Sequence, residues 1–67
     1  MDPKEIFELI VKADEKLKYA RSGKEDVRRK QAQDLLEQAR AAAAEIGNDA
    51  LVQQAETRLS DLAQGPA

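Results

Sequence analysis

Apolar residues recur at spacings of three and four along most of the chain, and this pattern predicts helices. Between residues 32 and 46 they fill one sector about 120° wide on a helical wheel, which is typical of a helix with one buried face. Gly47, Asn48 and Asp49 interrupt the pattern, and the same periodicity restarts at Leu51. We therefore expect the chain to fold back at this point as a helical hairpin.

A third amphipathic helix is predicted before this hairpin. Asp2 suits the N-cap, Pro3 the first helical position, and Glu5 the place where a capping box puts its carboxylate. Gly23 suits the left-handed residue that ends such a helix. The fold class is thus all-α, an antiparallel three-helix bundle forming a single domain over residues 1–64. The predicted helices span residues 3–21, 25–46 and 49–63, with Gly47 ending the second, Asn48 or Asp49 capping the third, and residues 65–67 forming a frayed tail.

The apolar stripes of the three helices define a predicted core. Its members are Ile6, Ile10, Leu17, Leu35, Leu36, Ala39, Ile46, Leu51, Leu59 and Leu62. Phe7 and Val11 lie outside the stripe of the first helix, about 60 to 100° further round than Ile10. Either this wider apolar arc packs against both other helices, or Phe7 and Val11 form a patch for a partner or a second copy.

The chain is too small to bury a large core. A domain of 67 residues buries only about 60% of the surface that its unfolded chain exposes. Apolar burial and conformational entropy then nearly cancel before any contact with another chain is added. We therefore expect self-association, as a homo-oligomer, or binding to a protein partner.

The residue types present argue against catalysis and against a cofactor or metal. The sequence contains no Cys and no His, so thiol chemistry, the common zinc sites and the usual general base near neutral pH are excluded. The neighbouring carboxylates lie on polar faces without a glycine-rich loop beside them. There is also no apolar run long enough for a bilayer and no signal-peptide pattern, so we expect a cytoplasmic protein that does not span a membrane.

Charge is distributed unevenly along the chain. Residues 16–30 hold seven basic side chains against two acids, whereas residues 31–67 hold two basic residues against six acids. We call residues 16–30 the basic corner. Its candidate partner contacts are Lys16, Tyr19, Arg21, Lys24, Arg28, Arg29 and Lys30.

The basic corner has three interpretations. It is an ordinary solvated corner with local pairs such as Asp26 with Lys30, or it binds an acidic protein surface, or it binds nucleic acid phosphates. A net charge of −2, a pI near 5.0 and only two aromatic residues argue against nucleic acid. Tyr19 either leans on the stems of neighbouring Lys or Arg residues or contacts a peptide.

Ala32, Leu36 and Ala39 form a small-large-small pattern in the hairpin, and QARAAAAEIGNDALVQQAETRL follows it. The pattern resembles the signature of the second helix of the tetratricopeptide repeat, and the segment that follows resembles a longer variant of that repeat. The resemblance implies a single degenerate repeat with an additional capping helix, and a scaffold that binds proteins through its helix faces. We therefore expect a non-catalytic protein-interaction module. A structural subunit of a larger assembly and a nucleic-acid accessory protein are the alternatives.

Overall fold

The computed structural model describes residues 1–18 and 25–64, and in them it shows three α-helices and no strand. The helices are α1 (Pro3–Lys18), α2 (Glu25–Glu45) and α3 (Asp49–Ala63). The predicted all-α fold class is therefore confirmed, and the predicted start of each helix agrees with the structure. The expectations for Gly23 and for the tail at 65–67 lie outside the described residues.

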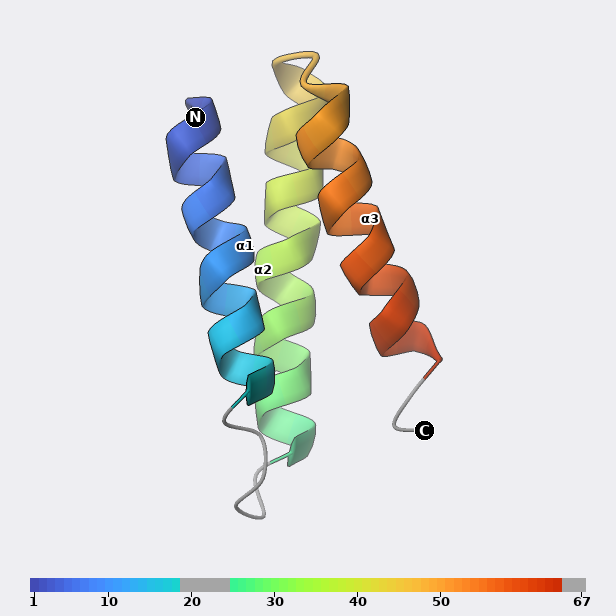
Figure 1. Ribbon diagram of the computed structural model, residues 1–67. Helices are drawn as coiled ribbons and strands as arrows, with labels where there is room; N and C mark the ends of the chain where they lie inside the picture. The colour runs from blue at the N-terminus through green and yellow to red at the C-terminus, as the bar shows by residue number, and fades with distance from the viewer. Residues whose placement is uncertain (19–24, 65–67) are drawn as a thin grey trace.

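The three helices form an antiparallel bundle with α2 in the middle (Figure 1). Both α1 and α3 pack along α2, but they scarcely touch each other. Figure 1 also shows α3 leaning away from α2 and α1 toward its C-terminal end. The bundle is therefore open along the side between α1 and α3.

The N-terminus of α1 carries the predicted capping box. The backbone N–H of Glu5 donates to Oδ1 of Asp2 at 2.8 Å, and the backbone N–H of Asp2 donates to Oε1 of Glu5 at 3.2 Å. These two reciprocal bonds satisfy donors that the helix itself leaves without partners. Residues three positions apart thus fix where α1 begins.

A tight turn joins α2 to α3. Gly47 has a φ of 71°, the left-handed conformation in which glycine avoids the clash of a side chain. The N–H of Asn48 donates to the carbonyl of Ala43 at 2.8 Å, and that of Gly47 donates to Ala44 at 3.1 Å, which is the Schellman arrangement. The Asn48 side chain then accepts a bond from the N–H of Leu51 at 3.1 Å. Asn48, rather than Asp49, is therefore the N-cap of α3.

The buried core is thin. It contains Ile6, Ile10, Ala13, Ala32, Leu36, Ala39, Ala43, Leu51 and Ala55. Five of these nine are alanines, which let helices approach closely but remove little apolar area from water. Leu17, Leu35, Leu59 and Leu62 were expected inside the core, but they are only partly buried and pack against its edge.

The prediction that Ile46 belongs to the core is wrong, because its side chain is 43% exposed. Helix α2 ends at Glu45, and the Gly47 turn follows directly. In Figure 1 this end of α2 extends beyond the N-terminal end of α1. Ile46 therefore follows the last residue of α2, at the end of the helix that extends beyond α1.

Candidate interaction surfaces

The structure separates the three consecutive basic residues at the start of α2. Successive residues of a helix point about 100° apart, so Arg28, Arg29 and Lys30 face different surroundings. Lys30 forms an exposed ion pair with Asp34, with 3.3 Å between Nζ and Oδ1. The local pair expected for Lys30 is therefore made with the acid one turn later and not with Asp26.

Arg29 makes a structural contact. Its Nη2 donates a partly buried hydrogen bond to the backbone carbonyl of Leu62 at 2.8 Å. The last carbonyls of a helix have no partner within the helix, and α3 has no basic residue in its own last turn. Arg29 of α2 therefore supplies the donor and positive charge that the end of α3 lacks.

Arg28 faces a hollow of about 300 Å³ that it lines together with Lys12, Glu15 and Lys16 of α1. Within residues 1–18 and 25–64, none of these three cations forms an ion pair. We call Lys12, Lys16 and Arg28 the basic hollow. Lys12 was not among the predicted contacts, although its spacing of four residues from Lys16 places both on one side of α1.

Three of the predicted contacts, Tyr19, Arg21 and Lys24, lie outside the described residues. Of the remaining four, the structure brings Lys16 and Arg28 together in the basic hollow. Lys30 and Arg29 have the separate contacts given above. The basic corner is therefore not one continuous contact surface in the part of the chain that the structure describes.

A larger hollow of about 480 Å³ lies between α2 and α3, where α3 leans away (Figure 1). Its lining mixes cations and acids, including Arg40 and Glu37, with the partly buried Leu59 and Leu62. Arg29 also lines this hollow, from which it reaches the end of α3. Opposite charges along one wall give the hollow no strong preference for either sign of ligand.

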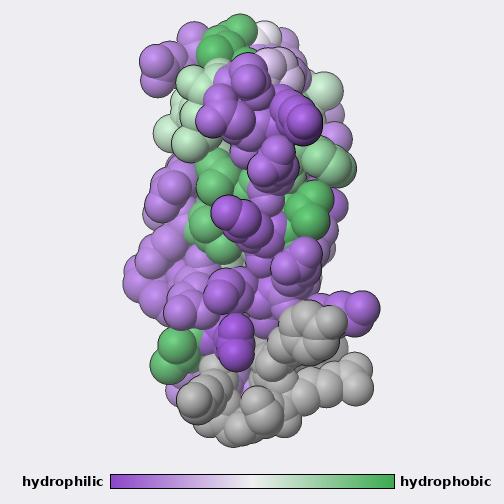
Figure 2. Space-filling model, turned by 90° about the vertical axis from the view of Figure 1, so that its left-hand side faces the viewer, coloured by the Kyte–Doolittle hydropathy of each residue, from purple (hydrophilic) through white to green (hydrophobic). Residues whose placement is uncertain are grey.

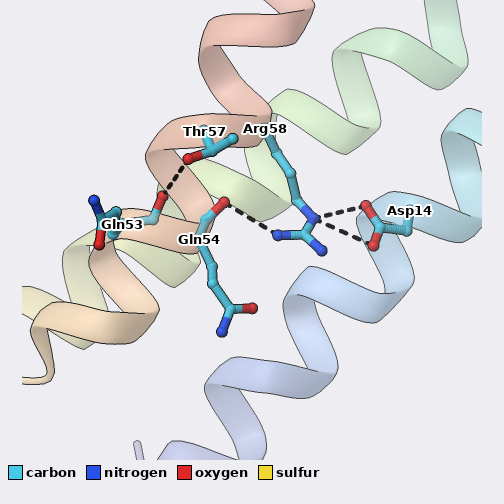
Figure 3. Close-up of polar contacts among 5 residues, drawn as sticks. All are labelled: Asp14, Gln53, Gln54, Thr57 and Arg58. Atoms are coloured by element: carbon cyan, nitrogen blue, oxygen red, sulfur yellow. Dashed lines mark hydrogen bonds and ion pairs between the residues drawn. The ribbon is translucent and has the colours of Figure 1, made fainter.

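An ion pair bridges α1 and α3 (Figure 3). Nε of Arg58 donates to both carboxylate oxygens of Asp14, at 2.9 Å to Oδ1 and 3.2 Å to Oδ2. Nη1 of Arg58 donates to the carbonyl of Gln54 at 3.2 Å, one turn earlier in α3. That second bond fixes the direction of the guanidinium toward α1.

Phe7 and Val11 lie at the surface, 47% and 38% exposed. Neither residue belongs to the buried core, and the exposed part of each side chain is available to another molecule. Figure 2 looks onto the side of the molecule where α1 lies and shows apolar areas separated by hydrophilic side chains. Apolar surface of this kind is suited to a small contact and not to a large hydrophobic interface.

The described residues hold no group of three or more acids placed to bind a metal ion. None of the helices in this part of the chain is long and apolar enough to cross a membrane. The sequence matches no protein-family model, and neither a curated protein nor a solved structure is detectably similar to it. The tetratricopeptide resemblance therefore rests on the chain's own pattern, in which Ala32, Leu36 and Ala39 are all fully buried.

Proposed function

We propose that this chain is a non-catalytic protein-interaction module that self-associates through the surface of α1 carrying Phe7 and Val11. The observation behind the proposal is the exposure of these two large apolar side chains, one helical turn apart. Among the described residues, only Ile6, Ile10, Leu36 and Leu51 are buried side chains larger than alanine. The apolar side chains of Phe7 and Val11 are therefore large compared with the few large side chains that a single copy buries in its core.

Burial of this pair against a second copy adds apolar area that a single copy cannot bury. Complete burial of a Val or Phe side chain contributes about 1.5–3 kcal/mol, and these two are already about half buried. The expected gain is therefore about 2 kcal/mol per copy, which is substantial for a thin core. By mass action, such an assembly is more stable at higher protein concentration.

The similarity of α2 and the segment that follows it to a tetratricopeptide repeat supports the same class of function. Ala32, Leu36 and Ala39 are the residues of α2 that carry the resemblance. All three are buried, so they pack against other residues of the same chain. The faces of α1 that point away from α2 then remain for contacts with other proteins. A structural subunit of a larger assembly is the related alternative, and it predicts poor folding of the isolated chain at low concentration.

Molar mass in solution tests the proposal. Light scattering from about 10 μM to about 1 mM covers the dissociation constants expected of weak contacts. We expect the mass to rise from 7.4 kDa toward twice that value, and Phe7→Ala to hold it near the monomer. Val27→Ala is the matched control, because Val27 is 56% exposed on α2. A constant monomer mass, or equal effects of the two variants, would contradict the proposal.

The basic hollow supports a second candidate function, the binding of an acidic protein segment. Lys12, Lys16 and Arg28 concentrate positive charge without an ion-pair partner among the described residues, so an incoming carboxylate relieves their mutual repulsion. Glu15 in the same hollow repels either kind of anion, but the net charge of −2 opposes a densely charged nucleic acid more than a short acidic segment.

A fluorescent oligoglutamate peptide tests this second candidate, with a DNA duplex of equal charge as the comparison. We expect peptide binding that weakens with salt and is lost when Lys12, Lys16 and Arg28 are replaced together by Gln. Lys30→Gln is the control, since Lys30 lies outside the hollow. Arg29 stays unchanged, because its loss would disturb α3 and confuse unfolding with lost binding. Preference for the DNA duplex would contradict the acidic-segment candidate and favour the nucleic-acid alternative.

A further inference from the structure

Helix α1 carries a second stripe of residues besides the one that faces the core. Lys4, Phe7, Val11, Asp14 and Lys18 follow one another at spacings of three, four, three and four. That is the spacing of the contact positions in paired helices. On a wheel of 100° per residue the five fall in a sector about 80° wide, centred roughly 120° from the buried stripe of Ile6, Ile10 and Ala13. We call these five residues the second stripe.

The second stripe is accessible in the single copy. Phe7 and Val11 form its apolar centre and are exposed. Lys4 is exposed and forms no ion pair within the described part of the chain. Asp14 already accepts from Arg58, but its side chain is 48% exposed, and a carboxylate has room for further donors. Apolar residues therefore lie between a free cation and an accessible anion.

We propose that α1 pairs antiparallel with α1 of a second copy through the second stripe. Phe7 then packs against Val11 of the partner subunit, and Lys4 lies opposite Asp14 of the partner subunit. Positions 7 and 11 are equally distant from position 9, and so are positions 4 and 14. One two-fold axis beside position 9 therefore produces both kinds of contact twice, as a self-complementary dimer requires.

Charge decides the direction of the pairing. In a parallel, in-register pair, each Lys4 faces the other Lys4 and each Asp14 faces the other Asp14, which is repulsive at both ends. The antiparallel pair replaces these two repulsive contacts by two attractive contacts, each between Lys4 of one copy and Asp14 of the other. Phe7 and Val11 are buried in the parallel and in the antiparallel pair alike. The charged residues that flank them, Lys4 and Asp14, therefore favour the antiparallel arrangement.

The expected affinity is low. A stable interface buries about 800 Å² per partner, and one helix face with two apolar residues offers much less. We expect a dissociation constant of about 0.1–1 mM, weaker at high salt because the flanking charges are exposed. The inference rests on the proposed function and adds the orientation and register of the self-association.

Sedimentation equilibrium on matched variants tests the register. Lys4→Glu places a carboxylate opposite Asp14 of the partner subunit, and we expect it to weaken dimerisation about three- to tenfold. Lys12→Glu makes the same charge change on another side of α1, in the basic hollow, and is expected to leave dimerisation unchanged. A parallel pair predicts no loss with Lys4→Glu, since it exchanges one like-charged contact for another.

Disulfide trapping tests the orientation directly, because the chain has no cysteine of its own. A Lys4→Cys chain and an Asp14→Cys chain are mixed and oxidised mildly, and the products are separated by mass. We expect the mixed disulfide to exceed both symmetric products. A statistical mixture, or an excess of the two symmetric products, would overturn the antiparallel register.

The outcomes separate this inference from the proposed function. A chain that stays monomeric at about 1 mM overturns both. Dimerisation that is lost in Phe7→Ala, but is equally affected by Lys4→Glu and Lys12→Glu, overturns the register and leaves self-association through α1 standing. Circular dichroism of each variant at low concentration shows whether the single copy keeps its helices, so a folding defect is not mistaken for lost pairing.

Discussion

Helix α3 meets its two neighbours in very different ways. Against α2 it places the buried Leu51 and Ala55, and its end is held by the Arg29 bond to the Leu62 carbonyl. Against α1 it makes few contacts, and these include the exposed ion pair between Arg58 and Asp14. The comparison shows that α2 organises the domain, with α1 and α3 each depending on it separately.

The two halves of α3 also differ in how closely they are held against α2. Its N-terminal half has the Asn48 cap, the Gly47 turn and the small residues of α2 beside it. Its C-terminal half borders the larger hollow and leans away from α2 (Figure 1). Fewer buried contacts and more accessible backbone mean that opening motions of α3 should begin at its C-terminal end.

The largest effect is expected from Leu51→Ala, which would break the α2–α3 contact itself. Leu51 is the one buried side chain larger than alanine that α3 contributes among the described residues. Truncation of a buried leucine lowers the free energy of unfolding by about 2–5 kcal/mol. Urea unfolding followed by circular dichroism measures the change, and Val52→Ala, at a partly buried neighbour, should cost less. Equal losses in the two variants would contradict the placement of Leu51 in the core.

Removal of the α3 cap should weaken the same contact at its N-terminal end. Asn48→Ala removes the acceptor for the Leu51 N–H and should lower the free energy of unfolding by about 1 kcal/mol. Asn48→Asp is the control, because an aspartate accepts the same bond and should keep most of the stability. Thermal unfolding at fixed protein concentration compares the three chains. An unchanged midpoint in Asn48→Ala would show that the cap contributes nothing.

Arg29→Ala should loosen the C-terminal end of α3. We expect a loss of about 1 kcal/mol, because the last turn of α3 loses a partly buried, charge-assisted bond. Hydrogen exchange measured by NMR should show faster exchange in the last turn of α3 and little change in its first turn. Arg28→Ala is the matched control, since Arg28 faces α1. Equal exchange rates in the two variants would contradict a structural role for Arg29.

The smallest effect is expected at the α1–α3 link. Arg58→Gln removes an exposed ion pair with Asp14 and should lower the free energy of unfolding by about 0.2–1 kcal/mol. Thermal unfolding at low and high salt should show the difference from the original chain shrinking as salt screens the pair. Arg40→Gln, which breaks no ion pair among the described residues, gives the control. A loss as large as that of Leu51→Ala would mean that α1 and α3 depend on each other after all.

The sequence predicts the helix boundaries well because their causes are local. Asp2 and Glu5 cap each other across three residues, and the positive φ of Gly47 suits the one residue type without a side chain. The spacing of apolar residues likewise gives the buried faces, as Ile6, Ile10 and Leu36 show. Each of these signals acts within about one or two helical turns.

Exposure and contacts at the surface are harder to predict from the sequence, because they depend on how far each helix extends along its neighbour. The wheel position of Ile46 favours burial, yet its side chain is 43% exposed, because it follows the last residue of α2. Lys12 lies outside the basic corner, but the packing of α1 on α2 brings it beside Arg28. Arg29 lies within the basic corner, but its side chain is used by the end of α3.

By itself, the sequence therefore determines three amphipathic helices, their caps and the side of each that is buried, because spacing and capping act between near neighbours in the chain. The tertiary structure alone decides that α1 and α3 scarcely touch, that Arg29 and Leu62 meet, and that Phe7 and Val11 remain exposed. The physical reason is that these features depend on the angle and offset at which one helix packs on another. The packing angle and the offset are determined jointly by side chains that lie far apart in the sequence.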